Sequence, residues 1–95
     1  MDTAQLKKLY GWYLTCSYAY YKMDISLIPD EQYDKMCKVL HKHFYEIQHR
    51  YWYVTRPEDF EAGTGYAINW PPELASAIHR WVTLHHGDKL HGTSG

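Results

Sequence analysis

The chain has few of the features that mark a secreted or membrane-bound protein. It contains 2 cysteines in 95 residues, without the C-x-x-C spacing or the dense cysteine framework of small disulfide-rich domains. Cys16 and Cys37 therefore predict reduced thiols in a cytoplasmic protein. No apolar stretch approaches the roughly 20 residues that a membrane span needs, and no N-terminal segment has the pattern of a signal peptide. We expect no membrane partner.

An excess of charge of one sign is also missing. The 10 basic and 11 acidic residues give a formal net charge of -1. Binding to a phosphate backbone relies on clustered positive charge, so we expect no direct nucleic-acid partner. What the chain does have is aromatic side chains, because 10 Tyr, 4 Trp and 2 Phe make up 17% of it and hydrophobic residues make up 45%. This composition is sufficient for one core in a domain of this size.

Apolar residues spaced by three and four predict a first helix over residues 3–23. Asp2 or Thr3 is a suitable N-cap. Gly11 disfavours a helix by about 1 kcal/mol relative to alanine, but the pattern continues past it, so we expect a packing reason for the glycine instead of a break. The residues on the predicted face are Leu6, Leu9, Tyr10, Tyr13, Ser17 and Tyr20.

Two further helices are predicted after a connection at residues 24–29. The second covers residues 30–49, because helical spacing joins Tyr33, Met36, Cys37, Leu40, Phe44 and Ile47. A third begins at Pro71 or Pro72, since proline suits a first turn, and Gly87 is its expected stop. Its predicted apolar face consists of Leu74, Ile78, Trp81 and Val82. We expect residues 88–95 to fray.

The segment between the second and third helices has a different character. Residues 51–55 are aromatic and β-prone, and Arg56 and Pro57 break the run, so we expect an extended or irregular link. Residues 57–60 favour a short helical turn, which Gly63 and Gly65 prevent from growing. The predicted fold is therefore an all-α single domain over residues 1–95. It comprises a helical hairpin (3–50), an aromatic linker (51–70), a third helix (71–87) and a tail (88–95).

Residues 20–34, which read YYKMDISLIPDEQYD, carry a specific pattern. Two adjacent tyrosines are followed by a short loop and then by P-D-E-Q-Y-D at the start of a helix. This arrangement resembles the N-terminal domain of NAD-dependent DNA ligases, where a tyrosine and a histidine precede a short loop and P-D-x-x-Y-D. The segments align without a gap, with Tyr21 at the histidine position. The resemblance covers only residues 3–50.

The resemblance implies a pocket for the nicotinamide mononucleotide (NMN) half of NAD, formed by Tyr20, Tyr21, Asp30, Tyr33 and Asp34. The oxidised nicotinamide ring is a flat cation, which a tyrosine face and a carboxylate both attract. Structural roles compete with this interpretation, because Asp30 is also placed to cap the second helix and Tyr33 begins its apolar face. The joint spacing favours the pocket, since capping does not require Asp34 and no turn requires Tyr20.

Catalytic and metal sites are not predicted. The K-x-D-G motif that supplies a ligase with its nucleophilic lysine is absent, because residues 22–25 read KMDI. Cys37 and His41 lie one helical turn apart, but a cysteine on an apolar face is typically an inert core residue. The remaining histidines form no metal-binding signature; those considered are His41, His43, His79, His85 and His86. We expect a protein that is not an enzyme and holds no metal.

Two functions remain open from the sequence. The first is a noncatalytic module that binds NAD or NMN. The second is a protein-interaction module, such as a small phage or mobile-element inhibitor of a host defence or DNA-processing enzyme, with the hairpin as scaffold. Tyrosine and tryptophan are preferred anchors of protein interfaces. The candidate partner-binding residues are Tyr51, Trp52, Tyr53, Tyr66 and Trp70, which either complete the core or form an exposed surface.

Overall fold

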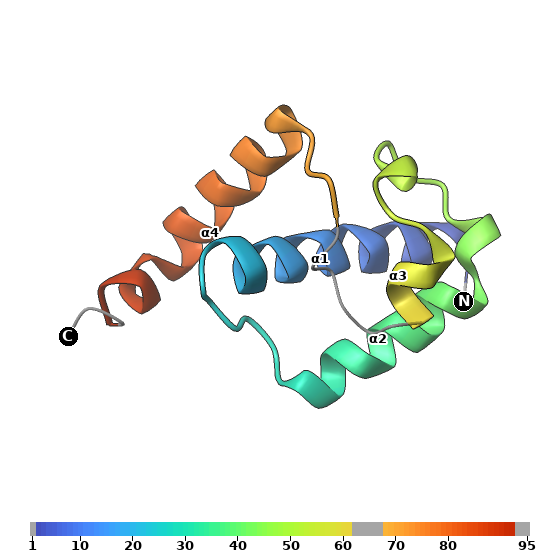
Figure 1. Cartoon of the computed structure of the whole chain (residues 1–95), viewed down its shortest axis with the longest axis horizontal. Helices are drawn as coiled ribbons and strands as arrows, with labels where there is room; N and C mark the ends of the chain where they lie inside the picture. The colour runs from blue at the N-terminus through green and yellow to red at the C-terminus, as the bar shows by residue number, and fades with distance from the viewer. Residues whose placement is uncertain (1, 62–67, 93–95) are drawn as a thin grey trace.

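The computed structural model describes residues 2–61 and 68–92, with side chains described for residues 2–60 and 68–85. Within these ranges the chain forms helices and no strand, so the all-α prediction for a small single domain is confirmed. Figure 1 shows the elements in order. These are α1 (Thr3–Lys22), α2 (Asp30–Lys42), the 3-10 turns η1 (Phe44–Glu46) and η2 (Trp52–Val54), α3 (Pro57–Glu61) and α4 (Pro72–Gly92).

Helix α1 is the central element of the fold. It packs against α2 on one side and α4 on another, and α3 packs on α2 (Figure 1). Asp2 caps α1, because its Oδ1 accepts a hydrogen bond from the Gln5 amide at 2.8 Å while Gln5 Oε1 accepts one from the Asp2 amide at 3.1 Å. This reciprocal pair satisfies two N–H groups that would otherwise lack partners. The cap therefore fixes where the central helix begins.

The core follows the predicted faces in large part, although Tyr20 and Trp81, which were predicted to lie on them, are exposed. Tyr10 and Tyr13 of α1 have no exposed surface, and both rings contact Phe60 of α3, with centroids 6.4 and 4.8 Å apart. Helix α1 runs without a break through Gly11, which faces the ring of His49. The helix is unbroken as expected, but a Cβ atom at this position would lie 3.4 Å from His49 Nε2, so packing does not require glycine here. Further buried core residues are Leu6, Leu14, Ala19, Met36, Cys37, Leu40, Ile78 and Val82.

The turn between α1 and α2 reverses the chain. Asp24 has a φ of 57°, a conformation that glycine adopts more easily than other residues. The amides of Met23 and Ile25 both donate to the carbonyl of Ala19, at 3.1 and 2.9 Å, and end α1. Pro29 occupies the N-cap of α2 and Asp30 is its first residue, so the proposed capping role of Asp30 is wrong. The fixed φ of proline suits the start of a helix. Its side chain has no hydrogen-bond acceptor, so α2 begins without a side-chain cap.

The second helix is shorter than predicted. Helix α2 ends at Lys42, where His43 leaves helical geometry with φ of -110° and ψ of 23°. The turn η1 follows, and Ile47 is extended with ψ of 120°. Histidine, phenylalanine, tyrosine and isoleucine have only moderate helix propensity, and the chain bends here to bring His49 against Tyr10 of α1, with ring centroids 5.1 Å apart. Tertiary packing thus overrides the periodic pattern at residues 43–49.

The segment after His49 is irregular, as predicted. Residues 52–54 form the turn η2, and residues 57–61 form the short helix α3. The Tyr10 hydroxyl holds the segment, because it lies 2.8 Å from both the Tyr51 carbonyl oxygen and Thr55 Oγ1. Gly63, Gly65 and Tyr66 lie outside the described residues. The aromatic segment is therefore attached to α1 by hydrogen bonds as well as by packing.

Helix α4 begins at Pro72 as predicted but continues to Gly92. The expected stop at Gly87 is wrong, because residues 88–92 are helical. Glycine ends a helix when the chain turns into a left-handed conformation, and here the helix continues through it. No described helix is long and apolar enough to cross a membrane.

Candidate functional site

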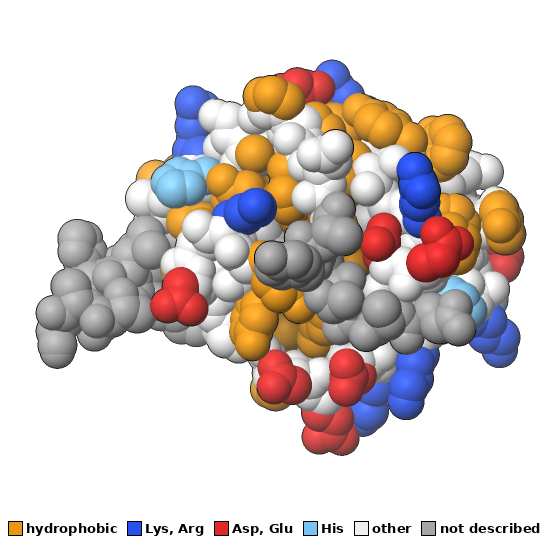
Figure 2. All heavy atoms as spheres, viewed as in Figure 1, with side chains coloured by type: hydrophobic (Ala, Val, Ile, Leu, Met, Phe, Trp, Pro, Cys, Tyr) orange, Lys and Arg blue, Asp and Glu red, His pale blue; other side chains and the backbone are white. Residues whose placement is uncertain are grey.

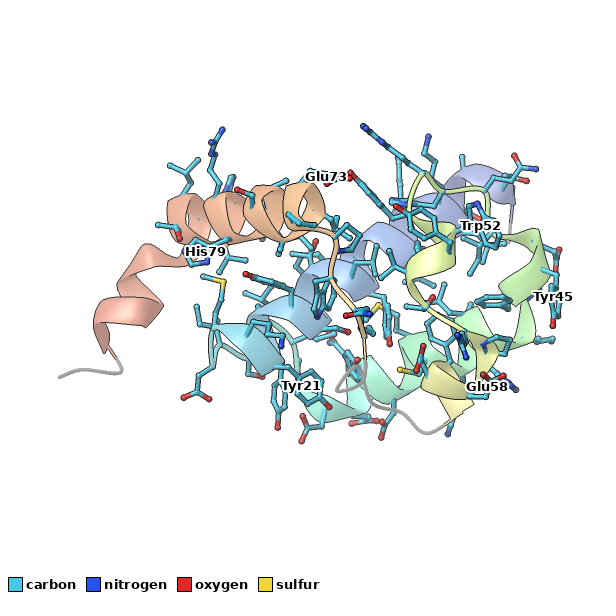
Figure 3. All side chains as sticks on the ribbon, turned by 45° about the horizontal axis from the view of Figure 1, so that its top comes forward. Tyr21, Tyr45, Trp52, Glu58, Glu73 and His79 are labelled. Carbon is cyan, nitrogen blue, oxygen red and sulfur yellow. The ribbon has the colours of Figure 1, made fainter. Side chains whose placement is uncertain are left out.

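A pocket of about 280 Å³ lies between the end of α1 and the start of α2. All the residues predicted from the ligase resemblance contribute to its wall. The lining residues are Cys16, Tyr20 and Tyr21 of α1, Ser26, Leu27 and Ile28 of the connecting loop, and Asp30, Tyr33 and Asp34 of α2. Figure 3 shows Tyr21 at this end of the hairpin. The turn at Asp24 thus brings residues of two different helices together around one cavity.

Helical spacing explains the lining. Cys16 and Tyr20 lie four residues apart and share one face of α1, while Asp30, Tyr33 and Asp34 follow the same rule on the first turn of α2. Tyr20 and Tyr21 meet edge to face, with ring centroids 4.9 Å apart and planes at 76°. Tyr20 is 49% exposed, so its ring has a surface that a ligand can reach. The pocket therefore offers aromatic faces from both helices.

Tyr33 is the most constrained ring of the pocket. Its hydroxyl lies 2.7 Å from Ser17 Oγ, and its ring stacks on Tyr13 with centroids 5.6 Å apart and planes at 27°. Desolvation by burial raises the pKa of Tyr33 far above its usual value, and the hydrogen bond with Ser17 opposes this only in part. The phenol thus stays neutral. Ser17 and Tyr13, both fully buried, hold the ring against the pocket wall.

The charged groups of the pocket are acidic. Asp30 and Asp34 are exposed, and neither forms an ion pair within the described part of the chain. Their neighbour Glu31 instead pairs with Lys35, with Oε1 and Nζ 3.5 Å apart. Figure 2 shows acidic side chains gathered over the start of α2. A carboxylate without an ion-pair partner attracts a cation that enters the part of the pocket beside it.

The buried cysteines have little nucleophilic character. Burial raises the pKa of the Cys16 thiol to about 12 and that of the Cys37 thiol to about 11. Both groups stay protonated near neutral pH, and the thiolate is the reactive form of cysteine. Cys16 consequently contributes a neutral, apolar group to the pocket wall.

A second hollow of about 470 Å³ lies near the other end of α1. We call Tyr45, Trp52 and Tyr53 the aromatic surface; their exposed fractions are 91%, 57% and 55%. Figure 3 shows Tyr45 and Trp52 toward the right-hand end of the molecule, away from Tyr21 near the middle of its lower edge. The hollow is lined by Phe44, Tyr45, Ile47, Gln48, His49 and Trp52. Two separate candidate sites therefore exist on one small domain.

The other predicted partner-binding residues do not join the aromatic surface. Tyr51 is partly buried and packs on the core. Trp70 is partly buried and meets Tyr18 edge to face, with centroids 5.3 Å apart. The Trp52 carbonyl oxygen accepts a hydrogen bond from Tyr10, and Tyr18 lies eight positions further along α1. Trp52 and Trp70 therefore contact α1 at different places. Tyr66 lies outside the described residues. Trp52 and Tyr53 are thus the predicted residues that the structure leaves exposed.

The histidines have local partners. His43 Nδ1 lies 2.7 Å from Glu46 Oε2, and the ring of His85 stacks on Trp81 with centroids 4.5 Å apart. Among the described residues, no three His, Cys, Asp or Glu side chains gather in a way that would hold a metal ion. His43 and His85 thus take part in a local hydrogen bond and a local stacking contact.

Sequence reasoning missed part of both sites. Cys16 could have been found, since it lies one helical turn before Tyr20 on the same face. The contact of Ser17 with Tyr33 joins two helices and has no local signal. Tyr45 was missed because the helical pattern assigned its neighbours Phe44 and Ile47 to a buried face.

No protein-family model, curated protein or solved structure matches this chain. The similarity to the ligase domain therefore stays a prediction that rests on residues 20–34.

Proposed function

We propose that the protein is a noncatalytic module that binds the nicotinamide end of NMN or NAD in the pocket between α1 and α2. The observation that supports this most strongly is the gathering of Tyr20, Tyr21, Asp30, Tyr33 and Asp34 around one cavity. The turn at Asp24 places the end of α1 opposite the start of α2, so the two tyrosines of α1 and the three residues of α2 line the same cavity.

The chemistry of the pocket fits the proposed ligand. The face of a tyrosine ring attracts a flat cation by about 0.5–2 kcal/mol, and the pocket adds the carboxylates of Asp30 and Asp34. Its volume of about 280 Å³ lies at the lower limit of the range of about 300–1,000 Å³ for ligand pockets. This size suits the nicotinamide ring with its sugar and leaves the rest of a dinucleotide outside.

Isothermal titration calorimetry with NMN and NAD tests this proposal. We expect saturable binding that Asp34→Asn weakens by about tenfold, because the substitution keeps the shape and removes the charge. Glu73→Gln is the matched control, since Glu73 is an exposed carboxylate on the first turn of α4 and does not line the pocket (Figure 3). Absence of binding at millimolar concentration for NMN, NAD and the nucleoside without its phosphate would refute the proposal.

A second candidate function is recognition of a protein partner through the aromatic surface. Three large aromatic side chains more than half exposed, beside an open hollow, favour this candidate. Burial of Tyr and Trp anchors supplies much of the binding energy of protein interfaces. In this case the hairpin is the scaffold that holds the aromatic surface. The protein would then be an inhibitor of a host defence or DNA-processing enzyme.

Co-purification from cells that express the tagged protein tests the second candidate. We expect a stoichiometric complex that Trp52→Ala disrupts and Asp34→Asn leaves intact, because Trp52 lines the second hollow and Asp34 lines only the pocket between α1 and α2. Trp81→Ala is the matched control, as Trp81 is partly exposed on α4, away from the aromatic surface. Retention of the complex in a Trp52→Ala, Tyr45→Ala double variant would exclude this surface.

A further inference from the structure

The charged groups of the pocket wall are all of one sign. Asp30 and Asp34 carry negative charge at neutral pH, and no Lys, Arg or His lines the cavity within the described side chains. Lys35 is close along the chain, but its ammonium group pairs with Glu31. Lys22 ends α1 and is exposed, outside the lining. The pocket thus has groups that attract a cation, whereas a phosphate would find no cationic side chain in its wall.

The N-terminus of α2 does not replace the cationic side chains that the pocket wall lacks. A helix N-terminus carries about half of a positive charge, and its free N–H groups bind phosphates in many proteins. Here the first turn and the residue after it hold three carboxylates, those of Asp30, Glu31 and Asp34. Their negative charge exceeds that of the helix dipole, and Lys35 offsets only one of them. A phosphate approaching this turn would meet a net repulsion.

The ligand forms differ in the relevant charge. Nicotinamide riboside, the nucleoside, is a cation through its ring nitrogen. NMN adds a phosphate monoester with a charge of about -1.5 to -2 at pH 7, which lies one sugar away from the ring. The ring and sugar are the part that a pocket of about 280 Å³ can hold. The phosphate would therefore remain at the acidic rim.

We propose that the pocket selects the unphosphorylated nucleoside, nicotinamide riboside, over the nucleotides NMN and NAD. The inference rests on the proposed function, since it concerns the same site and the same ring. It assigns Asp30 and Asp34 two roles: they attract the ring cation and they repel the phosphate. The specificity for the nucleoside thus arises from the charge of the wall and requires no additional contact.

Calorimetric titrations of the full chain with nicotinamide riboside, NMN and nicotinamide at low salt test the proposal. We expect the riboside to bind about tenfold more tightly than NMN, which corresponds to about 1.4 kcal/mol. Uncharged nicotinamide should bind more weakly than the riboside. Raising the salt concentration should weaken riboside binding and reduce its advantage over NMN, because exposed charges are screened beyond about 10 Å at 0.1 M ionic strength.

The double variant Asp30→Asn, Asp34→Asn separates charge from shape. Both side chains are exposed, so the variant should keep its helical circular dichroism, with a slightly lower melting temperature because both carboxylates lie near the N-terminus of α2. We expect it to lose the preference for the riboside, whereas Glu73→Gln keeps it. If NMN binds as tightly as the riboside to the wild-type chain, the inference is wrong and the proposed function stands. If neither compound nor NAD binds at millimolar concentration, both are wrong.

Discussion

Tyr10 links the central helix to the aromatic segment through a single hydroxyl group. The group lies 2.8 Å from the Tyr51 carbonyl oxygen and from Thr55 Oγ1, and Thr55 is itself buried. Burial raises the pKa of Tyr10 to about 12, against the opposing effect of the hydrogen bonds with Thr55. The phenol therefore remains protonated and bonded over the physiological pH range.

We expect Tyr10→Phe to reduce the free energy of unfolding by about 1–3 kcal/mol, because it leaves buried polar partners without a hydrogen bond. Urea unfolding monitored by circular dichroism measures the change. Tyr45→Phe is the control, since Tyr45 is 91% exposed, and it should unfold at the wild-type urea concentration. Equal stability of Tyr10→Phe and wild type would mean that the hydroxyl contributes nothing net.

His49 makes the fold sensitive to acid. Its Nδ1 accepts a hydrogen bond from the Tyr51 amide at 3.0 Å, which requires the neutral ring. Desolvation by burial, with a smaller contribution from Lys7, lowers the pKa of His49 below the usual 6.5. The unfolded chain then binds more protons than the folded chain below pH 6.5. His49 therefore contributes stability above that pH, which is lost as the pH falls through the lowered value.

We expect the melting temperature to fall between pH 7.5 and pH 5 (values chosen about 1 pH unit or more on either side of the usual histidine pKa). In His49→Gln this decrease should be smaller. His41→Gln controls for the other histidines, because His41 is exposed on α2 and its loss should leave the wild-type decrease in place. The same pH dependence in wild type and His49→Gln would rule out this residue as the source.

At the scale of elements, Gly11 lies inside α1, so substitutions there measure the effect of a glycine within a helix. A Cβ atom at Gly11 would lie 3.4 Å from His49 Nε2, which is ordinary contact. Alanine is favoured over glycine in a helix by about 0.8–1 kcal/mol, and the space allows it. We expect Gly11→Ala to raise the free energy of unfolding by up to about 1 kcal/mol, as measured by urea unfolding.

Larger side chains at the same position should have the opposite effect. Gly11→Leu would push His49 away from Tyr10, whose rings now lie 5.1 Å apart, and we expect it to unfold at a lower urea concentration than wild type. The pair of variants separates helix propensity from packing. A loss of stability in Gly11→Ala would show that His49 cannot move by even a few tenths of an ångström.

Elements were predictable where local pattern and local chemistry agree. The start of α1 at its Asp2 cap, the start of α2 after Pro29 and the start of α4 at Pro72 all follow from cap and proline chemistry. Their ends were not predictable in the same way. Helix α2 stops at Lys42 because the following residues pack on α1 through His49, and α4 continues through Gly87.

At the scale of the whole molecule, the pocket exists only in the folded chain, because its walls come from two helices and a loop. A ligand that binds the folded state alone stabilises it by about 2.7 kcal/mol at 100 times its dissociation constant. We expect nicotinamide riboside to raise the melting temperature of wild type in a thermal scan, and to leave that of the Asp30→Asn, Asp34→Asn variant nearly unchanged. A shift of equal size in both proteins would place the ligand elsewhere.

The two candidate sites were predictable to different degrees. The predicted pocket residues lie within fifteen positions of one another at residues 20–34, with Cys16 one helical turn before them, and a single turn is enough to bring them together. The aromatic surface depends on how residues 43–55 fold back on α1, through contacts with Tyr10 over 41 to 45 positions. Its composition was therefore predicted only in part, with Trp52 and Tyr53 included and Tyr45 missed.

The sequence by itself determined the helical class, the starts of the long helices and the candidate pocket, because each depends on residues within a few turns of one another. The periodic pattern marked Tyr10 and Tyr13 for burial, and both are enclosed. The tertiary structure alone decided the fate of the rings after residue 43, where Tyr45 and Trp52 remain exposed. The chain does not follow a regular helical pattern in that segment, and burial there depends on partners distant along the chain.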